Sequence, residues 1–282
     1  MTSIGHAIKI TETHVDDLDQ HDHAIDSIIA NDCTGLIVRN ALPHAMVERG
    51  CAQLLSPELG IDWMSPNAGM HGGEVRTIGE AATPCFTAFQ GPDSNRYAAS
   101  AANHDGWTEN IFGKDHPTPH LKRIFSRLFG GRAAAPALTL DGRAWAPFNY
   151  RALDPDEQIY AHHDNHYALP LYDELEPALD RDVLLSWFVT LQPSEHNGEL
   201  IIYGLWGSDP NPPMLPTRFL DIEVLEREFA RCAVKHRAGD LVIFDSGRHV
   251  HRVSPVVGDA VRLTMGGFLT VRKDRQALAF WS

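Results

Sequence analysis

The sequence predicts a mainly β fold, an antiparallel sandwich or jelly roll, preceded by a mixed α and β part. Its 282 residues allow two small domains or one large β domain with additions. Seven short β-rich runs, separated by turn residues, follow one another after residue 137. This spacing is typical of a sandwich or jelly roll. The clearest amphipathic helices lie before that point.

The part before residue 137 is expected to contain three helices and two strands. The clearest helix is 118–129, because its apolar residues recur every three or four positions and Gly130-Gly131 ends it. Pro43 suits the first turn of another helix. Residues 57–80 have no hydrophobic period and are expected to be loop. The expected helices are 16–30, 43–55 and 118–129, and the expected strands are 7–10 and 34–39.

The rest of the chain holds the seven runs, interrupted by an insertion at 204–232. A helix is expected at 217–232, and a segment rich in proline and glycine precedes it. Long insertions between core strands are often lids, so this one is interpreted as a mobile cover. The expected organisation is one domain over 1–282, with a mixed part at 1–136, a core at 137–272 and a tail at 273–282. The expected strands are 145–152, 158–163, 183–192, 199–203, 240–245, 249–256 and 262–271.

The composition indicates a globular protein that does not bind nucleic acid or a membrane. The chain has 24 basic and 37 acidic residues and a net charge of −13, which disfavours phosphate backbones and anionic lipid surfaces. Its longest apolar run, 183–191, is too short to span a bilayer. The four cysteines form no C-x-x-C pair, and the first residues lack a signal-peptide pattern. A cytoplasmic location is therefore expected.

The candidate chemistry lies in a His-x-Asp motif. On a strand, residues i and i+2 point to the same face, so His162 and Asp164 project together. The distant run 249–256 offers His249 and His251 as a third ligand. Two histidines and one carboxylate form the facial triad of non-heme Fe(II) oxygenases, which leaves three metal positions open. His251 is the preferred candidate, whereas His249 and His166 are expected to support the site or to be exposed.

A second pair of residues predicts an anion site on a neighbouring strand. Arg262 and Thr264 share one face, again at i and i+2 spacing. A guanidinium beside a hydroxyl can clamp a carboxylate. A metal with open positions near such a clamp predicts a dicarboxylic keto acid, bound to the metal at one end and clamped at the other.

Taken together, these motifs resemble the Fe(II)/2-oxoglutarate-dependent dioxygenases over residues 145–272. Four further segments are similar to the carrier-independent alkaloid halogenases, whose broad group includes the N-substituted amino-acid hydroxylases. The resemblance implies a double-stranded β-helix (jelly roll) core with N-terminal helices and a helical lid, forming a single oxygenase domain. It also implies Fe(II), 2-oxoglutarate and O2 as cofactor and co-substrates. The four segments are Gly247-Arg248, 251–254, 264–269 and Trp281-Ser282.

The chain departs from the halogenases at Asp164, where they have a glycine and hold chloride in the space left free. The resemblance with a carboxylate in that position implies hydroxylation of an unactivated C–H bond, with release of succinate and CO2. The implied substrate is a free small molecule, such as an N-substituted amino acid or a natural-product intermediate.

The resemblance also implies individual roles. His162, Asp164 and His251 would bind iron, while Arg262 and Thr264 would hold the distal carboxylate of 2-oxoglutarate. Tyr150 resembles a tyrosine that assists in related hydroxylases, although a packed sheet aromatic is an equal alternative. On a regular strand Arg151 points the opposite way, where it could reach an anion or form a structural ion pair.

The sequence says less about the substrate site. Arg76, in the glycine-containing segment 71–79, could pair with a substrate anion or be an ordinary surface arginine. Trp206 and Phe219, with Met214 and Leu215, could form an apolar wall. Two other functions stay open, namely a cupin-type metalloenzyme without 2-oxoglutarate and a non-enzymatic jelly-roll module with a structural metal. The substrate, the carbon attacked, the stereochemistry and the oligomeric state are not determined.

Overall fold

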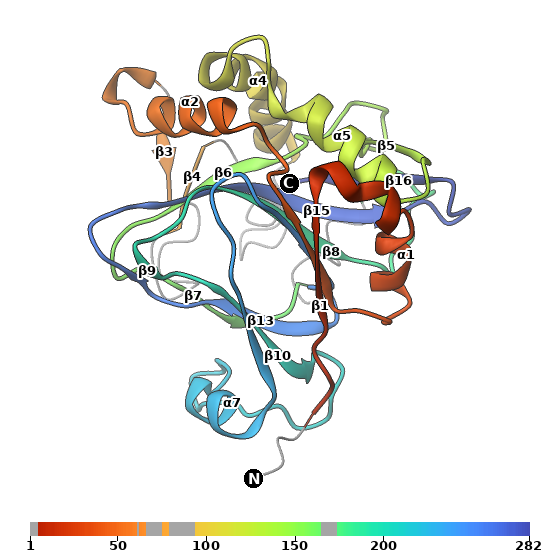
Figure 1. Cartoon of the computed structure of the whole chain (residues 1–282), viewed down its shortest axis with the longest axis vertical. Helices are drawn as coiled ribbons and strands as arrows, with labels where there is room; N and C mark the ends of the chain where they lie inside the picture. Colours follow the sequence, from red (N-terminus) through yellow and green to blue (C-terminus); the bar gives the residue numbers. More distant parts are fainter. Residues whose placement is uncertain (1–4, 61, 66–74, 79–93, 165–173) are drawn as a thin grey trace.

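The computed structural model describes residues 5–60, 62–65, 75–78, 94–164 and 174–282, with the backbone alone for 94–100. Two β-sheets face each other, and most of the helices cover the outer side of the larger sheet (Figure 1). This is the jelly-roll architecture that the strand pattern predicted. No helix in these ranges is long and apolar enough to cross a membrane.

Both sheets contain strands from distant parts of the chain. The larger sheet has the order β1 (Ile10–His14), β2 (Gly35–Arg39), β12 (Leu241–Phe244), β8 (Leu185–Gln192), β15 (Arg262–Val271), β6 (Asn149–Leu153), β4 (Arg76–Ile78) and β3 (Trp63–Met64), and β16 (Ala277–Trp281) joins β15 to β5 (Ala133–Pro136). The smaller sheet has the order β11 (Arg231–Val234), β10 (Leu200–Trp206), β13 (His249–Val253) and β7 (Ile159–His162). A short pair joins β9 (His196–Asn197) and β14 (Val256–Val257).

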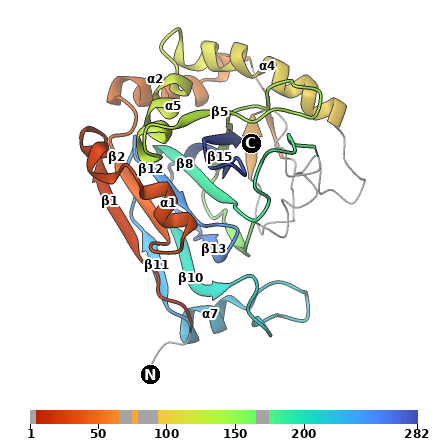
Figure 2. The same cartoon turned by 90° about the vertical axis from the view of Figure 1, so that its right-hand side faces the viewer.

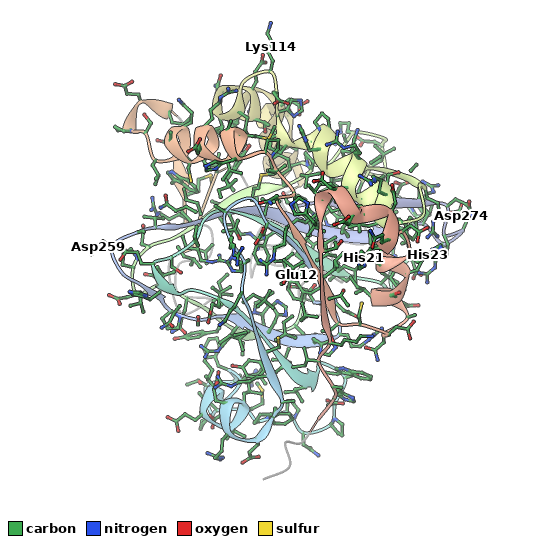
Figure 3. All side chains as sticks on the ribbon, in the orientation of Figure 1. Glu12, His21, His23, Lys114, Asp259 and Asp274 are labelled. Atoms are coloured by element: carbon green, nitrogen blue, oxygen red, sulfur yellow. The ribbon has the colours of Figure 1, made fainter. Side chains whose placement is uncertain are left out.

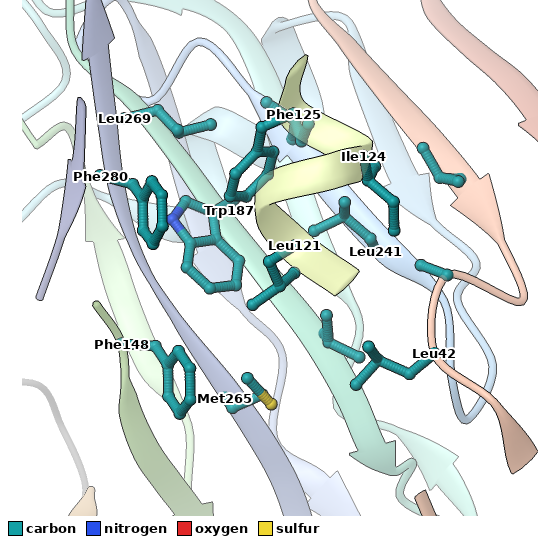
Figure 4. Close-up of a cluster of buried hydrophobic side chains, with 14 of the residues drawn as sticks. Leu42, Leu121, Ile124, Phe125, Phe148, Trp187, Leu241, Met265, Leu269 and Phe280 are labelled. Carbon is teal, nitrogen blue, oxygen red and sulfur yellow. The ribbon is translucent and has the colours of Figure 1, made fainter. Parts of the chain in front are cut away.

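The larger sheet has two different faces because side chains alternate along each strand. On β8, Trp187 points to the helix-covered face and packs against Phe125 of a covering helix, with ring centroids 5.2 Å apart (Figure 4). Its neighbour Phe188 points to the smaller sheet and joins the core between the sheets. The helix-covered face is the main hydrophobic core, whereas the space between the sheets also contains polar side chains.

The strongly amphipathic α5 anchors the helical layer. Leu121, Ile124, Phe125 and Leu128 are fully buried against the sheet, and burying each stabilises the fold by about 1.5–3 kcal/mol. The remaining helices differ more in length. The α-helices are α1 (Ala24–Ile29), α2 (His44–Leu54), α4 (Ser94–Phe112), α5 (Pro117–Leu128) and α7 (Ile222–Glu228), and the 3₁₀-helices are η1 (Val15–His21) and η2 (Pro57–Leu59).

The strand β15 crosses the whole molecule. Figure 3 places Asp259, in the turn before β15, and Asp274, in the turn after it, at opposite edges. A Cβ atom at Gly266 would lie 2.4 Å from the Trp187 carbonyl oxygen, and one at Gly267 would lie 2.1 Å from the Trp281 carbonyl oxygen. The two glycines therefore let β8 and β16 approach this central strand on either side.

Several sequence predictions are corrected in detail. The strand expected at 7–10 lies at Ile10–His14, where it pairs in parallel with β2, and the helix expected at 16–30 is divided into η1 and α1. Helix α4 has weak amphipathicity and was not predicted. The segment expected as loop at 57–80 contains η2, β3 and β4, and the tail at 273–282 contains the buried strand β16. The described residues of the part at 1–136 thus supply five strands to the larger sheet.

The helix of the insertion at 204–232 does not lie over the His-x-Asp motif. It is helical only at α7, because 231–234 form strand β11 and pair with β10. Leu225 of α7 packs with Tyr203 and Val250 on one face of the smaller sheet, and the neighbouring His251 points to the opposite face. Figures 1 and 2 show α7 on the outer side of β10 and β13, away from the larger sheet. The lid interpretation is therefore wrong for this helix.

Candidate active site

Strand pairing brings the three candidate metal ligands together. His162 ends β7 and lies directly opposite His251 on β13, with ring centroids 4.4 Å apart. Nε2 of His162 lies 3.5 Å from Oδ1 of Asp164, and Nε2 of His251 lies 3.8 Å from Oδ2. One ligand atom from each residue fits within 4.8 Å of the others, so the three side chains could hold a single metal ion.

Hydrogen bonds orient each ligand toward the centre of this triad. Nδ1 of His162 donates to the Tyr160 carbonyl at 2.7 Å, and Nδ1 of His251 donates to the His249 carbonyl at 3.0 Å. A carbonyl only accepts, so each Nδ1 carries a proton and each Nε2 is directed toward Asp164. The Ser186 hydroxyl donates to Oδ2 of Asp164 at 2.5 Å. Such outer partners are typical of metal sites.

The protonation states of His251 and Asp164 also suit a metal. Burial and the neighbouring His162 lower the pKa of His251 to about 4, so this imidazole is neutral at pH 7. Burial acts to raise the pKa of Asp164, but its contacts with His162, His251 and Ser186 outweigh this effect and hold the pKa below its usual value. Neutral imidazoles and an ionised carboxylate are the forms that bind metals.

A buried guanidinium marks the anion site. Arg262 is only 4% exposed and points from β15 toward the space between the sheets, over the ring of Phe188. No other described residue offers it a hydrogen bond or an ion pair, and its Nε is buried. Burial lowers the pKa of Arg262 to about 10, so it is still charged at neutral pH. A buried unpaired charge is costly, which indicates that Arg262 is built to receive an anion.

Arg151 connects the anion site with the triad. It lies opposite Thr264 across the β6–β15 pair, and its Nε donates to Oδ1 of Asn149 at 3.0 Å. Burial lowers the pKa of Arg151, whereas the charge of the nearby Asp164 acts to raise it. The charge of Arg151 in turn lowers the pKa of Arg262. Triad and anion site are therefore electrostatically coupled parts of one region between the two sheets.

Comparison with known proteins agrees with this geometry. Residues 8–282 match the family model of the carrier-protein-independent halogenase WelO5. The chain belongs to this halogenase family. A search of the curated proteins finds no sequence relative. The family match covers the triad, Arg262 and nearly all of the fold, and it confirms that this chain is an enzyme of the oxygenase class predicted from the sequence.

Two similar solved structures support the fold. An N-substituted L-amino acid dioxygenase from Burkholderia ambifaria AMMD is 15% identical, with a TM-score of 0.51, 92% of this chain covered and 90% of that chain. A prolyl hydroxylase of Trichoplax adhaerens, in complex with a hypoxia inducible factor peptide fragment, is 11% identical, with a TM-score of 0.50 and 93% of each chain covered. At these identities the likeness confirms the jelly-roll fold and nothing more.

Tyr150 of this halogenase-family chain lies on the wrong side of the sheet for its predicted role. It is 1% exposed within the main core, and its hydroxyl group lies 3.1 Å from the hydroxyl of Thr108 on α4. Burial raises the pKa of its phenol. The neighbouring Arg151 faces the other way, toward Thr264. The prediction that Tyr150 assists the co-substrate is therefore wrong, and its packed-aromatic alternative is correct.

Tyr150→Phe should consequently reduce stability without affecting 2-oxoglutarate. The variant removes the buried hydrogen bond to Thr108, which costs about 1 kcal/mol. Urea denaturation should show this loss, while 2-oxoglutarate binding to the metal-loaded protein should be unchanged. If the variant instead bound 2-oxoglutarate more weakly and kept its stability, Tyr150 would have to be assigned to the anion site.

Arg76 also lies away from the triad. It pairs with Ala152 on β6, whose side chain belongs to the helix-covered core, so Arg76 shares that face. Its guanidinium pairs with Asp154 at 2.5 Å and lies over the ring of Trp63. The predicted contact with a substrate anion is corrected to an ion pair at the sheet edge. Residues 71–74 and 79 of the surrounding segment lie outside the described ranges.

The predicted apolar wall is not assembled around the triad. Trp206 stacks on His6 with ring centroids 3.6 Å apart and meets the edge of His249, whereas Phe219 is 40% exposed and packs near Tyr160. Met214 and Leu215 are exposed. His249 is buried and its Nδ1 donates to the Tyr203 carbonyl, so it is not part of the triad. His166 lies outside the described residues.

Sequence reasoning missed four polar side chains near the site. Ser186 and Thr190 lie in an apolar strand at a spacing of four, so both face the triad side, and this parity was the available signal. Asn149 shares a face with Arg151 in the same way. No local pattern identifies the fourth residue, His236, because it lies in the loop after β11.

Proposed function

We propose that this chain is an Fe(II)- and 2-oxoglutarate-dependent hydroxylase of an unactivated C–H bond in a free small molecule, with succinate and CO2 as co-products. The observation that carries the proposal is the Asp164 carboxylate, which lies within ligand distance of both His162 and His251. In the halogenases that the sequence resembles, this position is a glycine and chloride occupies the space. A carboxylate here favours hydroxylation over chlorination.

The residues of the site fit the iron and the co-substrate. His162, Asp164 and His251 would hold Fe(II), and Arg262 with Thr264 and Arg151 would hold the distal carboxylate of 2-oxoglutarate. When bound, iron and 2-oxoglutarate supply the O2-dependent oxidation. The protein orients the ligands through Ser186 and two backbone carbonyls, as described above. It also limits access of water, since Phe244 packs edge-on against His251 with ring centroids 4.9 Å apart.

The proposed substrate is an N-substituted amino acid or a natural-product intermediate, handled by one oxygenase domain over 1–282. The cytoplasmic location stays a prediction from the sequence. The two other functions are less well supported. Neither a cupin-type metalloenzyme without 2-oxoglutarate nor a structural metal module accounts for the buried Arg262, which has no hydrogen-bond or ion-pair partner among the described residues. A structural site would also usually close with a fourth protein ligand, whereas the described residues supply three.

Anaerobic addition of Fe(II) and then 2-oxoglutarate should produce the visible charge-transfer band of a chelated keto acid. Screening of candidate small molecules by succinate release should then find substrates that gain one oxygen atom, even in high chloride, because Asp164 fills the halide position. Chloride-dependent chlorination by the wild-type protein would contradict the proposal, as would metal binding without any response to 2-oxoglutarate.

A further inference from the structure

A half-buried histidine, whose Nε2 atom is fully buried, lies next to the anion site and takes no part in the triad. The ring of His236 packs edge-on against Phe188, with ring centroids 5.2 Å apart. The guanidinium of Arg262 lies over the same Phe188 ring, 5.5 Å from its centroid. His236 and Arg262 therefore contact one aromatic side chain on the triad-facing side of the larger sheet.

The hydrogen bonding of His236 leaves one nitrogen unused. Nδ1 lies 2.8 Å from the Thr190 hydroxyl, whereas the buried Nε2 has no partner among the described residues. Burial, with the charge of Arg262, lowers the pKa of His236 to about 3, so the ring is neutral near pH 7 and carries one N–H. If the Thr190 hydroxyl donates to Nδ1, that N–H lies on Nε2.

Strand pairing places this donor beside the clamp. Thr190 on β8 is the direct cross-strand neighbour of Thr264 on β15, so their side chains share one face, and Arg262 lies two residues further along β15. Both Arg262 and Nε2 of His236 are buried donors that need an acceptor. A carboxylate has two oxygens and can satisfy both.

We propose that His236 is a further binding residue for the co-substrate, whose Nε2–H donates a hydrogen bond to the distal carboxylate of 2-oxoglutarate beside Arg262 and Thr264. This inference rests on the function proposed above. A neutral imidazole suits the position because it adds a donor without placing a further buried charge against Arg262 and Arg151, where like charges would repel. The Thr190 hydroxyl acts as a positioning group that sets the tautomer of the ring.

His236→Phe tests the inference because it keeps a ring against Phe188 but removes the N–H. Binding of 2-oxoglutarate to the Zn(II)-loaded protein, measured by calorimetry, should weaken roughly tenfold or more, as expected for a lost hydrogen bond to a charged group. Binding of 2-oxopentanoate, which lacks the distal carboxylate, should be the same in the wild type and the variant. His236→Gln keeps an N–H donor and should retain more affinity for 2-oxoglutarate than His236→Phe.

His104→Phe is the matched control. His104 is buried, and its Nε2 has no hydrogen-bond partner in the part of the chain that the structure describes, but it packs against Phe148 and Tyr150 on the helix-covered face. This variant should bind 2-oxoglutarate normally. Equal 2-oxoglutarate affinity in wild type, His236→Phe and His236→Gln would overturn the role of His236 alone. An equal loss of affinity for 2-oxoglutarate and 2-oxopentanoate in His236→Phe would also overturn it. A wild-type protein that binds Zn(II) but not 2-oxoglutarate would overturn the proposed function together with this inference.

Discussion

Asp164→Ala should abolish hydroxylation and weaken Fe(II) binding by more than about a hundredfold. Changes to outer partners of metal ligands typically cost about 10–100-fold, and this variant removes a ligand itself. It also removes the negative charge between the two imidazoles and leaves the Ser186 hydroxyl without its carboxylate partner. Anaerobic Fe(II) titration and succinate release measure the two effects separately.

Ser186→Ala is the matched control for this variant. It leaves all three ligands in place and removes only the hydrogen bond to Oδ2 of Asp164. Its loss of iron affinity should stay within about 10–100-fold. An Asp164→Ala protein with full iron occupancy and near-normal activity would show that another carboxylate holds the metal, and the site assignment would then be wrong.

Asp164→Gly goes one step further and recreates the residue of the halogenase relatives. It should lose hydroxylation as Asp164→Ala does, and in high chloride it should give traces of chlorinated product. Activity should be poor, because Ser186 and the surrounding groups are arranged for a carboxylate and not for a halide. Mass spectrometry of products formed with and without chloride distinguishes the two outcomes.

Arg262→Leu should lower the affinity for 2-oxoglutarate by roughly 30-fold or more and leave iron binding intact. Losing a buried charged hydrogen-bonded pair costs ~2–5 kcal/mol, and ~1.4 kcal/mol corresponds to a factor of ten. Arg262 projects from β15, whereas all three metal ligands lie on or next to strands of the smaller sheet. Its replacement should therefore affect 2-oxoglutarate binding and not iron binding. The KM for 2-oxoglutarate and an independent Fe(II) titration test this.

Arg252→Leu provides the comparison for Arg262→Leu. Arg252 is largely buried too, but it pairs with Glu226 on the outer side of the smaller sheet. Its replacement should reduce stability without changing the KM for 2-oxoglutarate. If Arg262→Leu left that KM unchanged, the anion site would have to be placed elsewhere, with Arg151 as the next candidate.

Local sequence patterns predicted the elements that form the site. Seven short runs became β6, β7, β8, β10, β12, β13 and β15. Alternation within single strands was enough to pair His162 with Asp164 and Arg262 with Thr264, because the side-chain period of two is a property of any extended backbone. Such patterns did not predict helix α4, because its apolar residues follow no clear helical stripe.

The choice between His249 and His251 depended on the tertiary structure. The two residues share one face of β13, so alternation alone treats them alike. The register between strands separates them, because His251 lies opposite His162 while His249 lies opposite Trp206. Register is set by how both sheets pack, and the local sequence does not contain that information.

By itself, then, the sequence determined the jelly-roll strands, the metal-binding pair on β7, the clamp on β15 and the family resemblance that these residues carry. Only the tertiary structure decided which face of each strand lies on the side of the metal-binding triad. It placed Tyr150 in the core and Arg151 in the site, moved α7 to the outside, and brought His236 beside Arg262. The physical reason is that side-chain alternation is local, whereas the identity of a face depends on which layer of distant residues covers it.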